Sequence, residues 1–170
     1  MSRSQKILIL GGLMLAALGM LYGLQYALFV EHQTLDHMGA SLNQAFVSAA
    51  EQNQAQSGAA LAGYTRTKYV YVRQVDVHSH WIGLAMLLIV LGAAFDSVAF
   101  AERARIWIAG ALLIGAVVFP LGVLLQTVVS GPLPSALAIT GCALETVALA
   151  LTIIGFARMG SHKVQQFDTT

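Results

Sequence analysis

Four long apolar runs alternate with polar connections along the chain, and their lengths indicate the architecture. The runs cover about residues 7–30, 78–100, 106–129 and 133–157. An α-helix rises about 1.5 Å per residue, and the hydrocarbon core of a bilayer is about 30 Å thick. The pattern therefore predicts four membrane-spanning helices.

The connection between the first two runs, residues 31–77, is polar but keeps a helical period. Residues recur at intervals of three and four on an outward leg and on a return leg. They are Leu35, Met38, Leu42, Ala45 and Ala49, then Tyr64, Lys68, Tyr71, Val75 and His78. We therefore expect helices one and two to continue past the membrane as an antiparallel hairpin. Gly58 is the expected break, and a turn centred near Gln56 puts His32 level with His80 and Asp36 level with Asp76.

Composition supports a membrane protein and excludes several other classes. Hydrophobic residues make up 57% of the chain and charged residues 10%, and the mean hydropathy is +0.71. These values are typical of an integral membrane protein. A net charge of +1 gives no reason to expect a nucleic-acid partner. The single cysteine, Cys142, excludes an intrachain disulfide and a Cys-x-x-Cys metal site.

The basic residues predict the orientation. Six of the nine gather before the first run, between the second and third, and after the fourth: Arg3, Lys6, Arg103, Arg105, Arg158 and Lys163. The other three, Arg66, Lys68 and Arg73, lie in the long 31–77 connection, where charge counts for less because long loops translocate largely regardless of it. The 130–132 loop carries no charge, so both termini are expected in the cytoplasm and residues 31–77 outside it. A cleaved signal peptide is the alternative for the N-terminus, but the first run is far longer than a signal core of about 7–15 residues. We therefore predict an all-α, four-helix transmembrane bundle, one domain over residues 1–170, with helices one and two extended as an extracytoplasmic hairpin, in a bacterial inner membrane.

Most of the histidines flank the first two runs. They are His32, His37, His78 and His80, whereas His162 lies in the polar C-terminal tail. Only 15 residues separate His80 from Asp96, about 22 Å of helix against a core of about 30 Å. The second span therefore draws in His80, and the topology brings the four histidines to one bilayer surface.

These histidines have carboxylates nearby, and the set suggests a ligand site. His32, His80, Asp36 and Asp76 have the ligand types that Zn, Cu, Mn or Fe accept. In a second arrangement, the carboxylates orient a histidine ring that serves as an axial ligand. Arg73 lies on the same helix face as Asp76 and His80. On a helix His78 and His80 differ by about 200°, so at most one of them is expected to point into the bundle. Simple solvation at the interface, or a role in proton or quinone handling, remain as alternatives.

One stretch of the second run carries a resemblance. Residues Val77 to Gly92, VHSHWIGLAMLLIVLG, resemble the His-x-His helix of small four-helix bacterial membrane proteins of unknown function, themselves distantly similar to haem-copper oxidase subunit one. The resemblance implies that His78 or His80 is an axial ligand of haem b, with His32 or His37 on the other side. The third and fourth runs contain no histidine, and no copper-binding His-His pair exists. The resemblance therefore implies haem binding or electron transfer without oxidase chemistry.

Three further polar residues lie in or near the spans. Glu145 is near the middle of the fourth run, where an acid is either an interhelical hydrogen-bonding group or a proton-transfer group. Gln25 and Gln126 lie near the level of the histidines. With Tyr22 and Tyr26 they are candidates to line a quinone headgroup pocket, although glutamines also join helices.

The leading functional expectation is a redox-associated membrane protein that holds haem b or a transition metal and exchanges electrons with quinone. The alternative is a non-catalytic accessory subunit or assembly factor, with no cofactor, in a larger membrane complex. The expected partners are the lipid bilayer and other membrane subunits or further copies of the chain.

Overall fold

The computed structural model describes residues 1–167, with side chains described to Arg158, so the side chain of His162 lies outside the described part. The elements in chain order are α1 (Arg3–Phe29), α2 (Glu31–Ala50), α3 (Gln54–Ala94), the 3-10 turn η1 (Phe95–Ser97), α4 (Glu102–Leu125) and α5 (Pro132–Phe167). Within residues 1–167 there is no strand, so the described chain is all-helical.

Four segments are long and apolar enough to cross a membrane, which indicates a multi-pass membrane protein. They are Arg3–Phe29, Gln54–Ser97, Glu102–Leu125 and Pro132–Arg158. Two helices end earlier than their apolar runs: α3 stops at Ala94 and α4 at Leu125. After α3, Phe95 and Val98 are buried although they lie outside the helix. The backbone N–H of Ala99 donates to the carbonyl of Gly155, 3.1 Å away, so this apolar connection is docked on α5.

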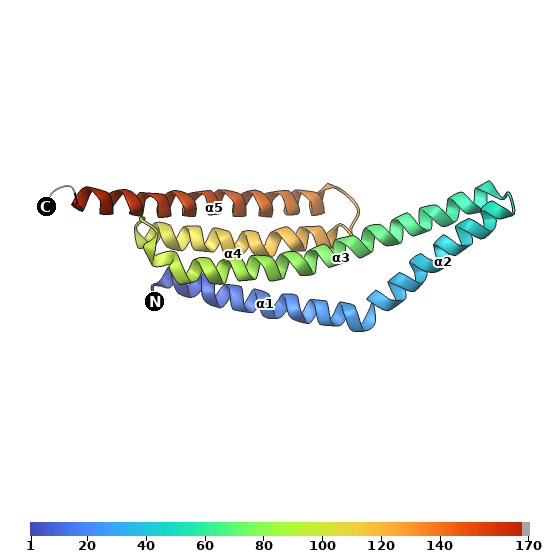
Figure 1. The fold of residues 1–170 in the computed structure, drawn as a ribbon, viewed down its shortest axis with the longest axis horizontal. Coiled ribbons are helices and arrows are strands. Elements are labelled where there is room, and N and C mark those ends of the chain that lie inside the picture. Colours follow the sequence, from blue (N-terminus) through green and yellow to red (C-terminus); the bar gives the residue numbers. More distant parts are fainter. Residues whose placement is uncertain (168–170) are drawn as a thin grey trace.

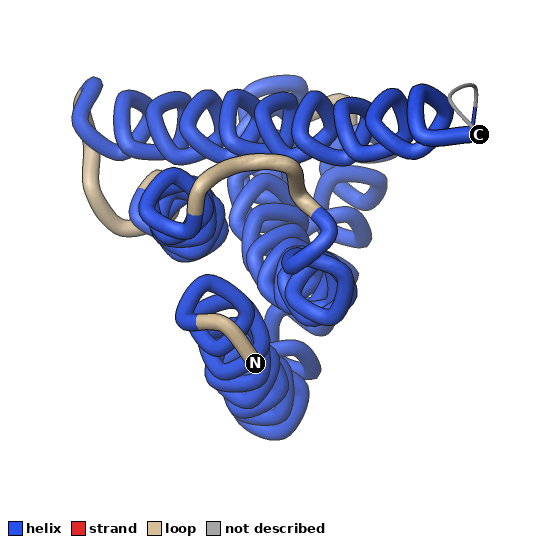
Figure 2. The backbone as a smooth tube through the Cα atoms, turned by 90° about the vertical axis from the view of Figure 1, so that its left-hand side faces the viewer, coloured by secondary structure: helices blue, strands red, loops and turns tan. Residues whose placement is uncertain are grey.

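Helices α1, α3 and α4 form the centre of the molecule, and α5 lies on one side of it. Figure 1 shows the N-terminus and the end of α5 at one end of the molecule, and α2 with the first part of α3 projecting from the other. Seen along that length in Figure 2, α5 crosses α4 obliquely. It packs on α4 and touches η1. The four long apolar helices, which we call the membrane part, are therefore α1, α3 and α4 packed together and α5 packed against α4.

Small residues let the helix backbones approach closely. On α1, a side-chain carbon at Gly12 would lie 2.9 Å from the carbonyl oxygen of Ala85, and one at Gly19 would lie 3.1 Å from the Cβ of Trp81. At the contact of α4 with α5, a carbon at Gly115 would lie 2.8 Å from the Cβ of Glu145. Close backbone approach through small residues is a common basis of helix association in membranes.

An ionic network ties the ends of three helices together where the N-terminus lies. The carboxylate of Glu102 accepts from the backbone N–H of Ser4 at 3.0 Å and from its hydroxyl at 3.2 Å. Arg105 pairs with Glu102 at 2.9 Å and with Asp96 at 3.2 Å. Since a helix N-terminus attracts negative charge, Glu102 holds the start of α1 against α4.

The segment that leaves the membrane part consists of α2 and residues 54–72 of α3, and is called the extension below. The chain bends at Val30, between α1 and α2, and α2 packs along the first part of α3. The turn lies at residues 51–53, with Gln52 at a φ of 58° and the side chain of Asn53 capping α3. The expected turn near Gln56 is therefore wrong, as is the expected break at Gly58, which lies inside α3.

The corrected turn changes which residues face each other. The Ser57 hydroxyl donates to the carbonyl of Ala45 at 3.0 Å, and the Tyr71 hydroxyl lies 3.5 Å from Glu31 Oε1. The start of α2 is therefore level with Tyr71. His80 lies nine residues further along α3, about 13 Å away at 1.5 Å per residue. The Gln-, Ala- and Ser-rich sequence around the turn fits a helix at every position, so periodicity alone could not locate it.

Candidate functional site

His78 lies between α3 and α1. Its Nδ1 is 2.9 Å from the carbonyl oxygen of Gly19, and its ring lies against Gly23, where a side-chain carbon would overlap it. The ring fits because position 23 of α1 is a glycine. His78 therefore helps to join α3 to α1.

His80 faces a different neighbour. Its ring packs edge-on against Phe119 of α4, with 4.9 Å between centroids, and its Nδ1 lies 2.6 Å from the backbone carbonyl oxygen of Asp76. The group that orients the imidazole is thus the backbone of Asp76, whereas the expectation was its carboxylate. The two histidines do point in different directions. Because α3 packs on both α1 and α4, each of them meets another helix, and the expectation that only one could point into the bundle is wrong.

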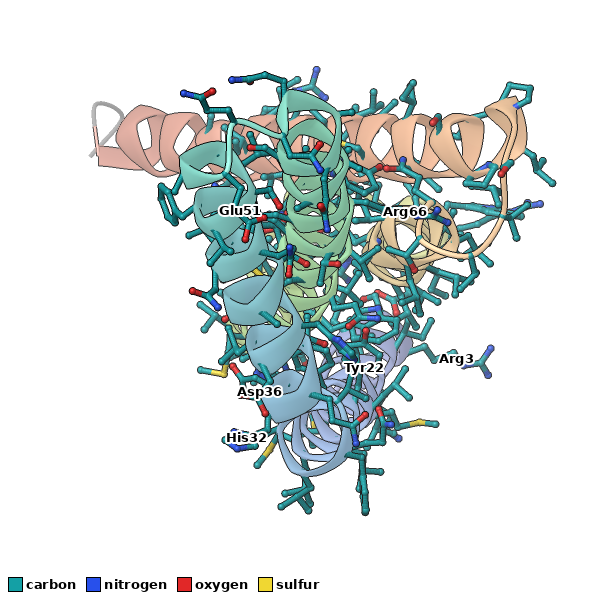
Figure 3. All side chains as sticks on the ribbon, turned by 90° about the vertical axis from the view of Figure 1, so that its right-hand side faces the viewer. Arg3, Tyr22, His32, Asp36, Glu51 and Arg66 are labelled. Carbon is teal, nitrogen blue, oxygen red and sulfur yellow. The ribbon has the colours of Figure 1, made fainter. Side chains whose placement is uncertain are left out.

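The remaining predicted ligands lie on α2. His32, His37 and Asp36 are exposed, and Figure 3 shows His32 and Asp36 at the outer edge of α2. His80, by contrast, is turned toward α4. Among the residues whose side chains are described, no three His, Cys, Asp or Glu side chains gather closely enough to hold a metal ion. The structure does not bring His32 and His80 together.

Arg73 and Asp76 lie where α3 leaves the membrane part. The Arg73 guanidinium lies over the ring of Tyr69, 5.3 Å from its centroid. The salt bridges among the described side chains all involve Arg105, so Arg73 has none of them. A shallow groove of about 490 Å³ between Tyr69, Arg73 and Asp76 runs along this face.

Glu145 is buried where α5 contacts α4. It is 6% exposed, it packs on Gly115, and its Oε1 has no hydrogen-bond partner among the described residues. The hydrogen bond to a neighbouring helix that the sequence suggested is therefore not formed in this arrangement.

The four residues suggested for a quinone pocket have different neighbours. Tyr22 packs edge-on against Trp81, 5.4 Å between centroids, and Tyr26 lies 6.4 Å from Tyr71. Gln25 is exposed on α1. Gln126 instead lines a groove of about 440 Å³ formed by α3, α4 and α5.

Sequence reasoning missed two features. One is this groove, in which Gln126 and Arg73 occur together with Phe119 and Cys142. That residues 73 and 126 line one groove depends on helix packing, so no local pattern could have shown it. The other is an apolar stripe on the free side of α2, which is described below. Its residues have a helical period in the sequence, but the period alone does not show which of them no other helix covers.

Comparisons with protein-family models, with curated proteins and with solved structures found no match to this chain.

Proposed function

We propose that this protein is a non-catalytic accessory subunit or assembly factor of a larger membrane complex, and that the extension binds the partner. The supporting observation is that large apolar side chains are exposed on a segment that must lie outside the lipid. Helix α3 has 41 residues, which corresponds to about 61 Å, twice the thickness of the hydrocarbon core. Its first half carries the charges of Arg66, Lys68 and Arg73, so this half is the part in water.

Three of the apolar residues of α2 form a stripe. Leu35 is 45% exposed and Phe46 is 69% exposed, with the half-buried Leu42 between them. The spacing of seven and four residues places the three on one helix face. An exposed apolar patch on a water-facing segment is typical of a protein interaction site. We call Leu35, Leu42 and Phe46 the α2 stripe.

Charge favours one kind of partner. Helix α2 contains Glu31 and Asp36 and no Lys or Arg, and Glu51 follows it. The complementary surface is an amphipathic helix with an apolar face and basic residues beside it. The proposed orientation keeps both termini in the cytoplasm and the extension on the other side as an extracytoplasmic hairpin, so the partner segment lies there too.

Quantitative co-purification with matched variants tests this function. Phe46→Gln removes the most exposed apolar side chain of the stripe. Leu61→Gln makes the same kind of change on α3, where Leu61 is 48% exposed. We expect one membrane protein with a basic amphipathic segment to be captured by the wild type and by Leu61→Gln. Phe46→Gln should capture it at least about tenfold less, the loss expected for a central apolar anchor. Equal capture by the two variants, with both folded, would contradict the proposal.

A redox role is the second candidate, and one observation favours it. Both His78 and His80 place Nδ1 at a backbone carbonyl, which leaves Nε2 as the nitrogen free to bind a metal. The groove beside His80 has a volume of about 190 Å³, whereas pockets for organic ligands have about 300–1,000 Å³. This groove is therefore too small for haem b. His80 is the one His, Cys, Asp or Glu among its lining residues, so a metal ion bound there would need further ligands from outside the groove. Absorption spectra of the oxidised and dithionite-reduced protein, with metal analysis, test this candidate.

A further inference from the structure

The groove between α3, α4 and α5 has a polar rim and an apolar floor. Arg73 and Gln126 lie at the rim, where α4 ends at Leu125. Phe119 lies two turns inside the helix end, about 10 Å along α4, and Ile139 and Ala143 of α5 line the other wall. The groove is open, with a volume of about 440 Å³. A polar end and an apolar depth match a ligand with a polar head and a hydrocarbon tail.

The rim is positively charged. Arg73 has no ion pair among the described side chains, and its guanidinium is held over Tyr69. A guanidinium offers a fork of donors that matches phosphate oxygens. Gln126 adds an amide that can donate to the same head. Because Arg73 has no salt bridge among the described side chains, an anionic head is favoured over a neutral one such as a quinone ring.

We propose that this groove is a binding site for an anionic phospholipid, with the phosphate at Arg73 and Gln126 and an acyl chain along Phe119, Ile139 and Ala143. The bilayer supplies such a ligand to any groove that opens at this level. Basic pockets between membrane helices on the cytoplasmic side bind anionic headgroups, and the same pairing of a basic side chain with a phosphate applies at this end of the helices. The proposal does not depend on the partner of the α2 stripe, which lies on another element.

Native mass spectrometry of the purified full chain tests the site. The probes are phosphatidylglycerol and phosphatidylcholine with identical acyl chains, added to protein in neutral detergent. We expect the wild type to retain one phosphatidylglycerol in preference to phosphatidylcholine. Arg73→Gln should reduce that preference by about tenfold or more, because a charged hydrogen bond is lost. Arg73→Lys should retain part of it.

Two further variants separate the head from the tail and from general charge. Ala143 is exposed in the groove, so Ala143→Trp fills the tail region and should also lower retention. Arg66→Gln removes an exposed charge of α3 that does not line the groove, and it should leave binding unchanged. Helicity and the unfolding temperature confirm that each variant is folded.

Three results would overturn the proposal. One is equal retention of the two lipids by the wild type. Another is an equal loss in Arg66→Gln and Arg73→Gln, which would indicate general electrostatic attraction. The third is displacement of phosphatidylglycerol by a short-chain quinone whose own binding survives Arg73→Gln, which would make the groove a quinone site.

Discussion

At the residue scale, Glu145 is the most unusual group in the membrane part. A carboxyl group that is 6% exposed and packed on Gly115, with an Oε1 that has no hydrogen-bond partner among the described residues, costs free energy relative to an apolar side chain. Glu145→Leu should therefore raise the free energy of unfolding, by about 1–3 kcal/mol. Glu145→Gln keeps a buried polar group and should change it little. Denaturant titration in detergent measures both.

The opposite result for Glu145 would be equally clear. If Glu145→Leu lowers the free energy of unfolding by about 1–3 kcal/mol, the carboxyl has a buried partner that the chain alone does not supply. A water molecule, a bound ligand or a second copy of the chain would then complete the α4–α5 contact.

The contact of the His78 ring with Gly19 and Gly23 of α1 gives a second prediction at the residue scale. A side-chain carbon at Gly23 would overlap the His78 ring, so Gly23→Ala must displace the ring and break its bond to the Gly19 carbonyl. We expect a loss of about 1–3 kcal/mol, the usual cost of overpacking. Gly83→Ala is the matched control, because no atom lies within 4 Å of a carbon added there. Equal unfolding free energies for the two variants would show that the His78 ring does not lie against Gly23.

At the scale of elements, the turn that joins α2 to α3 is strained at one position. Gln52 has a φ of 58°, a left-handed conformation that costs a residue other than glycine roughly 1–2 kcal/mol. Gln52→Gly should therefore stabilise the extension by about 1 kcal/mol. Gln52→Val should destabilise it. Hydrogen exchange of the α2 amides reads this local stability, and faster exchange in Gln52→Gly would place the turn elsewhere.

At the scale of the whole molecule, the proposed orientation can be tested by labelling in intact cells. In a Cys142→Ala background, cysteine is introduced at Gln56, near the tip of the extension, or at Arg103, at the opposite end. Both positions are exposed. A membrane-impermeant maleimide should label position 56 and leave position 103 unlabelled until the membrane is opened. The reverse pattern would place the extension in the cytoplasm.

Much of the architecture follows from the sequence because apolar runs of this length have few alternatives in a membrane. The all-helical chain and the four long apolar helices are confirmed. The sequence could not show whether His32 lies beside His80 along the paired helices. That depends on the turn at Gln52, which lies within a stretch that fits a helix throughout. The order of residues along the chain predicts that four histidines lie near one membrane surface. It could not show that His78 and His80 face α1 and α4 while His32 faces outward, because these directions depend on packing.

The central claim is that the α2 stripe binds a basic amphipathic helix of another membrane protein, and photocrosslinking in cells tests it most directly. A benzophenone amino acid replaces Phe46 in one version of the chain and Leu61 in another, and the adducts are mapped by mass spectrometry. The account predicts one adduct of defined mass from position 46, at a segment containing Lys or Arg, and much less of it from position 61. Adducts only with lipid or with this chain itself, or the same adduct in equal yield from both positions, would contradict it.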